Sequence, residues 1–385
     1  MKSIKSASVK GKRVIVRVDF NVPFKDGKIL DDNRIVSSLT TINYLVEKKA
    51  KVILLSHLGR VKTEEDKKKN SLRIVAKHLS TLVSTPVYFI PQTRGELLET
   101  TLDNLCEGEI AVIENTRWED YPKTLESSCD EKLSKYWASL GDIFVLDAFG
   151  SAHRCHASTY GISKYLPSYA GFLVQNETTV LDKALKQNKT LILGGAKVDD
   201  KIGVINNLIK TSNKVLIGGG MCFTFLQAKG YNIGESILSE EHIDYAKKLL
   251  KKYPNTIILP IDVVTQNGVK NIEDMSDKDI GYDIGPKTIK LFTEELKTSK
   301  LVLWNGPLGK YEDKEYENGT KKVMQFLKKQ KFNTILAGGD ITGASKYFNI
   351  ELYYVSTGGG STLEYLEGKK FKTLERLNGT DKWKK

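Results

Sequence analysis

The sequence predicts an α/β protein of two domains, each built on a parallel β-sheet. A chain of 385 residues is too long for one ordinary core, and domains of roughly 150–200 residues are typical. Short apolar runs alternate with helical patterns through both halves, and hydrophobic residues make up 40% of the chain. Runs that are apolar almost throughout are typical of strands covered on both faces, as they are in parallel sheets.

Four strands with helices between them are expected in the first half, and each strand ends in a polar turn. The expected strands are 13–18, 51–55, 109–113 and 142–146, and two of the expected helices are 36–48 and 72–83. Ligands of open α/β sheets bind beyond the carboxyl ends of the strands. That edge is expected to carry Asp19, Asn21, His57, Arg60, Arg117 and Arg154. Some of these arginines could instead pair with local carboxylates. Chance alone, however, does not explain polar and charged side chains at the ends of four separate strands.

The second half repeats the scheme, but its turns are rich in glycine. Six strands are expected at residues 190–193, 214–217, 256–259, 300–303, 334–337 and 352–355. Four of the turns that follow them are glycine clusters, at 194–195, 218–220, 338–339 and 358–360. Tight turns alone explain one or two such clusters, but not four on one edge. The common nucleotide motifs GxxxxGK[ST] and GxGxxG are both absent.

Arginine and glycine divide between the halves. Eight of nine arginines lie in the first 154 residues, and 22 of 31 glycines lie after residue 190. Arginine suits a bidentate grip on carboxylate or phosphate. Glycine-rich turns allow main-chain amides to approach phosphates. The two halves are therefore predicted to bind different anions.

The turn at residues 194–201 combines a glycine pair with Lys197 and Lys201. If a helix begins here, the spacing of four places both ammonium groups on one helical face near its positive end. The alternative is a glycine-rich turn with two solvated lysines.

Residues 168–186 are expected to form one helix that connects the two halves.

Composition excludes several classes of protein. No apolar run approaches the roughly 18 residues of a membrane helix, and the N-terminus lacks the apolar stretch of a secretory signal. The four cysteines are far apart without metal-ligand spacing, as expected for free thiols in a reducing, cytoplasmic compartment. The net charge of +12 is spread along the chain, so specific nucleic-acid binding is not expected.

The turns resemble those of phosphoglycerate kinases over essentially the whole chain. The resemblance is carried by eight segments in order: 17–23, 56–60, 147–154, 194–202, 218–221, 283–286, 304–307 and 356–360. It implies two doubly wound (Rossmann-like) parallel-sheet lobes joined by a helix and hinge. The expected parts are a 3-phosphoglycerate-binding lobe (1–170), an interdomain helix (171–188), a nucleotide-binding lobe (189–366) and a C-terminal tail (367–385) that packs back on the first lobe.

The resemblance also implies a reaction, namely reversible phosphoryl transfer between 1,3-bisphosphoglycerate and Mg-ADP to give 3-phosphoglycerate and Mg-ATP, by a monomer that closes at its hinge. The implied substrate-binding residues are Asp19, Phe20, Asn21, Arg34, His57, Leu58, Gly59, Arg60, Arg117 and Arg154. The implied nucleotide-binding residues are Gly194, Lys201, Gly218, Gly219, Gly220, Asn305, Pro307, Glu312, Gly338, Gly339, Asp340 and Ile341. Asp340 would hold Mg²⁺, and the catalytic groups would be Arg34, Lys197 and the amides of Gly338 and Gly359.

The chemistry agrees with the residues present. A carboxylate that attacks phosphorus is already ionised at pH 7, so the reaction needs charge stabilisation and in-line positioning rather than a general base.

Four positions depart from the family pattern: Ile341 for Ser or Thr, Lys310 for an apolar residue, Thr116 for Leu and Val61 for Pro. The first two bear on nucleotide affinity and base preference. The alternatives are a catalytically reduced relative that binds nucleotides or anions, and nonspecific nucleic-acid binding through the net charge.

Overall fold

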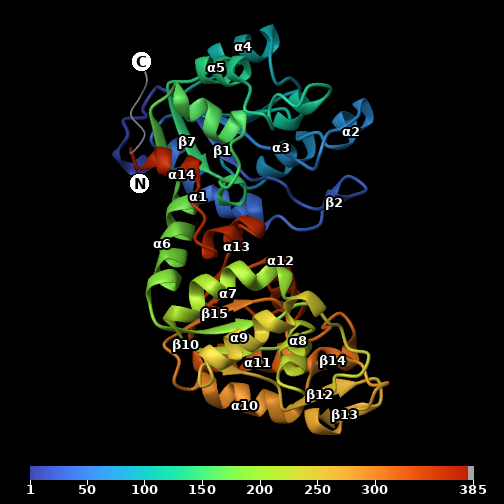
Figure 1. Ribbon diagram of the computed structural model, residues 1–385. Helices are drawn as coiled ribbons and strands as arrows, with labels where there is room; N and C mark the ends of the chain where they lie inside the picture. Colours follow the sequence, from blue (N-terminus) through green and yellow to red (C-terminus); the bar gives the residue numbers. More distant parts are fainter. Residues whose placement is uncertain (380–385) are drawn as a thin grey trace. The chain divides into compact units, whose positions relative to one another are not determined.

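The computed structural model describes residues 1–379 as two compact units (Figure 1). The first unit comprises Met1–Thr179 together with the C-terminal segment from Lys370, and the second comprises Val180–Lys369. In the C-terminal segment, α14 (Lys372–Leu377) packs beside β8 (Ser168–Ala170) of the first unit. The last part of the expected tail, residues 380–385, lies outside the described residues.

The first unit is built on a six-stranded parallel sheet in the order β5-β6-β4-β1-β7-β8. Besides β8, its strands are β1 (Arg13–Val18), β4 (Lys51–Leu55), β5 (Val87–Ile90), β6 (Ile110–Ile113) and β7 (Ile143–Asp147). The helices are α1 (Asn33–Glu47), α2 (Glu64–Lys69), α3 (Arg73–Leu79), α4 (Glu96–Asp103) and α5 (Glu131–Ser139), and a short hairpin joins β2 (Phe24–Lys25) to β3 (Lys28–Ile29). The chain leaves β1 toward β4 on one side and later returns to β7 on the other. The turns after β1 and β7 therefore meet at a topological switch point.

The second unit contains a six-stranded parallel sheet in the order β11-β10-β9-β15-β16-β17. Its strands are β9 (Lys189–Leu193), β10 (Ser212–Ile217), β11 (Ile257–Ile258), β15 (Leu301–Asn305), β16 (Asn333–Leu336) and β17 (Tyr354–Val355). Taken along the sequence, this is the order 3-2-1-4-5-6 of doubly wound nucleotide-binding folds, with the switch point between β9 and β15. The predicted fold class of two doubly wound parallel-sheet α/β units is confirmed.

Helices flank the second sheet, and a small antiparallel sheet adjoins it. The helices are α7 (Ile202–Leu208), α8 (Met221–Ala228), α9 (Ile243–Lys252), α10 (Pro286–Leu296), α11 (Asn318–Gln330), α12 (Gly339–Tyr347) and α13 (Gly360–Leu366). The antiparallel strands are β12 (Asp262–Thr265), β13 (Gly268–Asn271) and β14 (Gly281–Ile284), in the order β13-β12-β14. A core that includes Trp304, Phe292 and Leu336 packs between the sheet and its helices.

A buried carboxylate fixes the start of the helix that connects the two units. The chain passes from the first unit to the second through α6 (Phe172–Lys186), whose first turn donates to Asp147 from the main-chain nitrogens of Leu173, at 2.9 Å, and Val174, at 3.4 Å. Asp147 is fully buried at the end of β7. A carboxylate that accepts from the free amides of a first turn is an effective helix cap. The connecting helix is thereby anchored in the sheet of the first unit.

Three expectations from the sequence are wrong. Residues 168–170 form β8 rather than the start of the connecting helix, which begins at Phe172. Residues 194–198 are irregular, residues 199–201 form a 3₁₀ turn and α7 starts only at Ile202, so Lys197 does not belong to a helix. Lys197 and Lys201 therefore do not share a helical face. The last strand is also shorter than the expected 352–355, since only Tyr354 and Val355 pair.

The sequence analysis did not identify β5 or the antiparallel sheet. Neither contains a long buried run: the side chains of β5 alternate in exposure, and those of β13 are exposed or half-buried. Among the described residues, none of the helices combines the length and the apolar character that crossing a membrane demands.

Candidate active site

The turns after β1 and β4 are joined by hydrogen bonds at the carboxyl edge of the first sheet. The side-chain oxygen of Asn21 accepts from the main-chain nitrogen of Gly59 at 2.8 Å, and the main-chain nitrogen of Phe20 donates to Oγ of Ser56 at 2.8 Å. Gly59 has φ +60°, and a Cβ there would lie 2.9 Å from the side chain of Asn70. These contacts bring the expected residues of two separate turns together.

Asp19 and Arg34 form an ion pair at this edge. Nη1 of Arg34, in the first turn of α1, lies 2.9 Å from Oδ2 of Asp19. Asp19 is buried, whereas one third of the Arg34 side chain is exposed. The guanidinium therefore keeps donors available to a ligand while the carboxylate fixes its position.

Arg117 follows β6 and is held in a 3₁₀ turn (Thr116–Asp120). Its Nη1 lies 3.4 Å from Oδ2 of Asp120, and burial lowers its pKa. Its Nε is buried and has no hydrogen-bond partner among the described residues. A buried donor without a partner is costly unless a ligand satisfies it. Arg117 thus suits an anionic ligand.

The alternative of local pairing holds for only some of the arginines. Arg34 and Arg117 pair with Asp19 and Asp120. Arg60 and Arg154 are exposed and form no ion pair within residues 1–379. The edge consequently carries more positive than negative charge, and buried Leu58 supplies apolar packing beneath it.

Three glycine-rich turns interlock by main-chain contacts at the carboxyl edge of the second sheet. The nitrogen of Gly194 donates to the oxygen of Asn305 at 2.9 Å, and the nitrogen of Gly219 donates to the oxygen of Leu308 at 2.9 Å. A Cβ at Gly219, whose φ is +62°, would lie 2.7 Å from the oxygen of Pro307. These turns follow β9, β10 and β15, so they meet at the switch point. Backbone packed this closely leaves no room for side chains.

The turn after β16 adjoins Asn305. A Cβ at Gly338, with φ +105°, would lie 2.5 Å from Nδ2 of Asn305, which donates to the oxygen of Ala337. Oδ1 of Asn305 is buried without a hydrogen-bond partner in the described part of the chain. Gly338 precedes α12, whose first main-chain amides have no partner within the helix. Free amides beside an unsatisfied carbonyl are suited to a polar ligand.

The two lysines of the turn after β9 differ in burial. Lys201 is buried, and this burial lowers its pKa, an effect opposed by the charges of Asp200 and Asp340. Lys197 is exposed and has no ion-pair partner among the described residues. Gly359, the residue before α13, has φ +56°, and a Cβ there would meet nothing within 4 Å.

Asp340 and Glu312 present exposed carboxylates, and no hydrogen bond to either is found in the described residues. Ile341 is different, since it is fully buried in the core with Trp304 and Leu336. Its side chain therefore packs in the core and not at the carboxyl edge of the sheet. The sequence did not indicate this burial. Nζ of Lys310 lies 2.8 Å from Oδ2 of Asp313, and this hydrogen-bonded ion pair raises the pKa of Lys310.

Carboxylate oxygens suit Mg²⁺, which commonly takes one or two carboxylates together with substrate phosphates. Asp340 fits this description because its carboxylate is exposed beside the glycine turns. Elsewhere in the described chain, the ligand atoms of Asp199, Glu241 and His242 lie within 4.8 Å of one another. There Nε2 of His242 is already 2.6 Å from Oδ1 of Asp199. This hydrogen bond restrains the 3₁₀ turn at 199–201.

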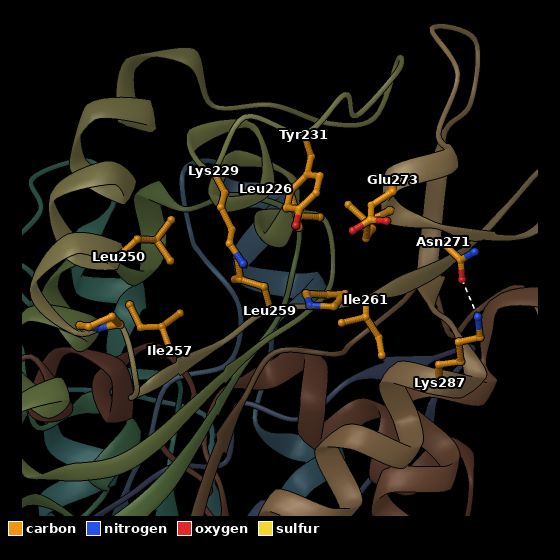
Figure 2. Close-up of a pocket in the computed structure, with 13 residues that line it drawn as sticks. Leu226, Lys229, Tyr231, Leu250, Ile257, Leu259, Ile261, Asn271, Glu273 and Lys287 are labelled. Carbon is orange, nitrogen blue, oxygen red and sulfur yellow. Dashed lines mark hydrogen bonds between the residues drawn. The ribbon is translucent and has the colours of Figure 1, made fainter.

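A cavity of about 450 Å³ lies elsewhere in the second unit (Figure 2). It is bounded by Leu226 of α8, Leu250 of α9 and Ile257 of β11. Lys287 donates to Oδ1 of Asn271 at 2.7 Å across one wall. None of the predicted site residues lines this cavity, so the cavity is separate from the candidate active site.

Comparison with known proteins decides the family. The family model for phosphoglycerate kinase matches residues 4–369. The chain belongs to the phosphoglycerate kinase family. A phosphoglycerate kinase from Enterococcus faecalis is 48% identical over 392 residues, covering 98% of this chain and 99% of that protein. One from Lacticaseibacillus casei is 49% identical over 380 residues, covering 95% and 96%.

Solved structures agree. The phosphoglycerate kinase of Coxiella burnetii matches with a TM-score of 0.87 at 35% identity, covering 99% of both chains. That of Pyrococcus horikoshii OT3 matches with a TM-score of 0.85 at 29% identity, covering 98% of both chains. The predicted kinase function is thereby confirmed, and the alternative of a catalytically reduced relative is not favoured. The roles of single residues remain predictions.

Buried Arg17, Glu126 and Ser158 and half-buried His156, beside the carboxyl edge of the first sheet, were missing from the predicted site. Arg17 is only 1% exposed and is the second-last residue of strand β1. An arginine inside an otherwise apolar strand was the available signal. Glu126 and Ser158 carried no signal, because a single carboxylate or hydroxyl in a polar loop looks the same whether it is buried or solvated.

Proposed function

We propose that the chain transfers a phosphoryl group reversibly between 1,3-bisphosphoglycerate and ADP, with the acid on the first unit and the nucleotide on the second. One observation carries this assignment: each unit presents a different anion-binding edge at its switch point. The first edge is built from guanidinium and imidazole groups, and the second from interlocked glycine turns with two lysines.

The acid would be bound by Arg34, Arg60, Arg117, Arg154 and His57. Arg60 and Arg154, which form no ion pair among the described residues, and Arg117, whose Nε has no partner there, supply charge for an anionic ligand. Guanidinium groups bind carboxylate and phosphate through two parallel hydrogen bonds. Asp19 would hold Arg34 in place, and Asn21 would hold the turn that contains Gly59. Both side chains would also accept a hydrogen bond from the hydroxyl group of the acid.

The nucleotide would lie across the turns at Gly194, Gly218–Gly220 and Asn305–Pro307, with Lys201 and Glu312 beside it. The support is the close main-chain packing of these turns, which brings their backbone together at one edge of the sheet. Gly339 and Asp340 begin a helix whose free amides suit phosphate oxygens. Ile341 would contribute only its main chain, because its side chain is buried. Asp340 would hold Mg²⁺, which supplies charge neutralisation on the phosphates when it is bound.

The transfer step needs no proton to move. A carboxylate oxygen of 3-phosphoglycerate attacks the γ-phosphorus, the bond from phosphorus to the bridging oxygen breaks, and ADP leaves with the electron pair. Lys197, Arg34 and the amides of Gly338 and Gly359 would stabilise the charge on the equatorial oxygens. Because the substrates lie on different units, the units would close during catalysis. Small-angle scattering with both ligands should then show compaction, and an unchanged radius of gyration would count against closure.

The setting of the enzyme is also part of the proposal. All four cysteines are free thiols, which suits a reducing, cytoplasmic compartment. A monomer is proposed from the likeness to the family alone, and no specific nucleic-acid partner is proposed because the net charge of +12 is spread along the chain.

The test is 3-phosphoglycerate-dependent ATP consumption, coupled to NADH oxidation through glyceraldehyde-3-phosphate dehydrogenase. We expect wild-type turnover to fall by roughly 10³-fold or more in Lys197→Ala, as for comparable donors to transferring phosphoryl groups. Lys210→Ala serves as the control, because Lys210 is also exposed but lies in the 3₁₀ turn after α7. A loss below tenfold in Lys197→Ala would remove this lysine from the transfer step.

A further inference from the structure

Arg17 makes three hydrogen bonds from a buried position in β1. Its Nε donates to Oγ of Ser158 at 2.8 Å, its Nη1 donates to the main-chain oxygen of Val18, and its Nη2 lies 3.0 Å from Nδ1 of His57. The side chain is 1% exposed, so it cannot reach a ligand directly. Its contacts act on the residues around it.

The contact with Arg17 decides the tautomer of His57. Arginine only donates hydrogen bonds and stays protonated, so Nδ1 of His57 must be the acceptor. The ring proton then lies on Nε2. Burial, together with the charges of Arg17, Arg117 and Arg154, lowers the pKa of His57 well below its usual value of 6.5. The ring is therefore neutral at pH 7 and presents Nε2–H on the side away from Arg17.

Glu126 balances the buried charge of Arg17 through Ser158. The hydroxyl of Ser158 donates to Oε1 of Glu126 while its oxygen accepts from Arg17, and the main-chain nitrogen of Ser158 donates to Oε2 at 2.9 Å. Glu126 is fully buried. A buried guanidinium is costly unless an opposite charge compensates it. Burial raises the pKa of Glu126, and Arg17 with the bonds from Ser158 opposes that rise.

His156 does not compete for this carboxylate. Its Nδ1 lies 3.8 Å from Oε1 of Glu126, but burial and neighbouring arginines lower its pKa to about 3. It is therefore neutral at pH 7, and the negative charge of Glu126 remains available to Arg17.

We propose that Glu126, Ser158 and Arg17 form a relay of positioning residues that fixes His57 as a neutral Nε2–H donor for the phosphoglycerate. The relay joins four separate segments: the loop before α5, the turn Ala157–Gly161, strand β1 and the turn after β4. A flexible or charged imidazole would present its donor in several orientations, which weakens the binding of a substrate that needs one. The part of the proposal that concerns substrate rests on the proposed function.

The decisive measurement is ¹⁵N NMR of the histidine rings in selectively labelled protein, with His57 assigned by loss of its signal in His57→Gln. In the wild type we expect the Nε2-protonated neutral form, unchanged between about pH 8 and pH 5.5. In Glu126→Gln and Ser158→Ala, the His57 signal should show mixed tautomers or titrate within this range. Ser158→Thr, which keeps the hydroxyl, should restore the wild-type signal.

Kinetics give the second readout. Glu126→Gln and Ser158→Ala should raise the KM for 3-phosphoglycerate about tenfold, with kcat within threefold of wild type and the KM for MgATP unchanged. Asp262→Asn is the matched control, because Asp262 is also a fully buried carboxylate but caps α10 in the second unit. It should lower the Tm and leave both the His57 signal and the KM for 3-phosphoglycerate unchanged.

A wild-type His57 that is charged or protonated on Nδ1 would overturn the relay, as would an unchanged signal in both variants. A changed signal with KM within twofold of wild type would overturn its role in substrate binding. Ser158→Ala removes a single oxygen, so the test stands even if Glu126→Gln does not fold. The NMR result decides the relay in the free protein even if the proposed substrate is wrong.

Discussion

A Cβ on Gly194 would lie 2.0 Å from the main-chain oxygen of Pro307. No adjustment of a side chain can relieve this contact, because the opposing atom belongs to the backbone. The turns after β9 and β15 therefore approach each other only because residue 194 is glycine. Their approach shapes the glycine-rich edge at the switch point of the second sheet, where we propose that the nucleotide binds.

Gly194→Ala should consequently separate these two turns. We expect kcat/KM for MgATP to fall at least tenfold and stability to fall by about 1–3 kcal/mol, as for other overpacked sites. Steady-state kinetics and thermal unfolding measure the two effects. Gly360→Ala is the comparison for stability, since a Cβ at Gly360 meets nothing within 4 Å and should change the free energy of unfolding by less than ~1 kcal/mol. Equal effects of both substitutions would show that the close approach at Gly194 is not required.

Arg34→Ala tests the transfer step from the first unit. If Arg34 stabilises the phosphoryl group in transit, kcat should fall by roughly 10³-fold. The control is Arg13→Ala, because Arg13 is also 33% exposed and also pairs with an aspartate, Asp103, at 3.0 Å. Arg13→Ala should keep kcat within about twofold, since exposed ion pairs contribute little. A similar kcat for the two variants would argue against the role of Arg34.

Asp147 makes the stability of the first unit depend on pH in an unusual direction. Burial raises its pKa to about 7 from 3.8, and its Oδ2 has no hydrogen-bond partner in the described chain. The folded state then binds the proton more tightly than the unfolded state, so this group lowers stability progressively as the pH rises from about 4 to 7. Above pH 7 the loss is complete, and below pH 4 it is absent.

Asp147→Asn removes this titration while keeping an oxygen to accept from the first turn of α6. Relative to wild type, the variant should gain about 1–3 kcal/mol in free energy of unfolding between pH 5 and pH 8. Urea unfolding followed by tryptophan fluorescence in a Trp304→Phe background measures it, because Trp304 lies in the core of the second unit whereas Trp118 and Trp137 lie in the first. Asp283, whose pKa burial also raises to about 7, is the counterpart in the second unit, and Asp283→Asn in the same background should leave the transition of the first unit unchanged. A constant difference between wild type and Asp147→Asn across this pH range would show that Asp147 does not titrate there.

The sequence predicted the large features and failed where burial decides the role of a residue. The main strands were correct to within one or two residues because apolar runs and the turn residues after them are local patterns. The glycine clusters indicated a shared edge, since only unusual backbone needs so many glycines. Ile341 and Glu126 could not be placed in the same way. An isoleucine next to Asp340 looks like a changed ligand contact in the sequence, whereas its helical position turns it into the core. Glu126 becomes a partner of Arg17 only through a long-range contact that no local pattern encodes.

Ile341→Thr separates the two interpretations of that position. If the side chain belongs to the core, introducing the hydroxyl should lower stability by about 1–3 kcal/mol, because a methyl group leaves the packing and a polar group enters it. The KM for MgATP should change by less than threefold, because no new hydroxyl reaches the nucleotide edge. Ile341→Val is the matched control, which loses a methyl group without adding polarity and should cost about 0.5–1.5 kcal/mol. A drop of tenfold or more in the KM for MgATP in Ile341→Thr alone would instead place this side chain at the phosphates.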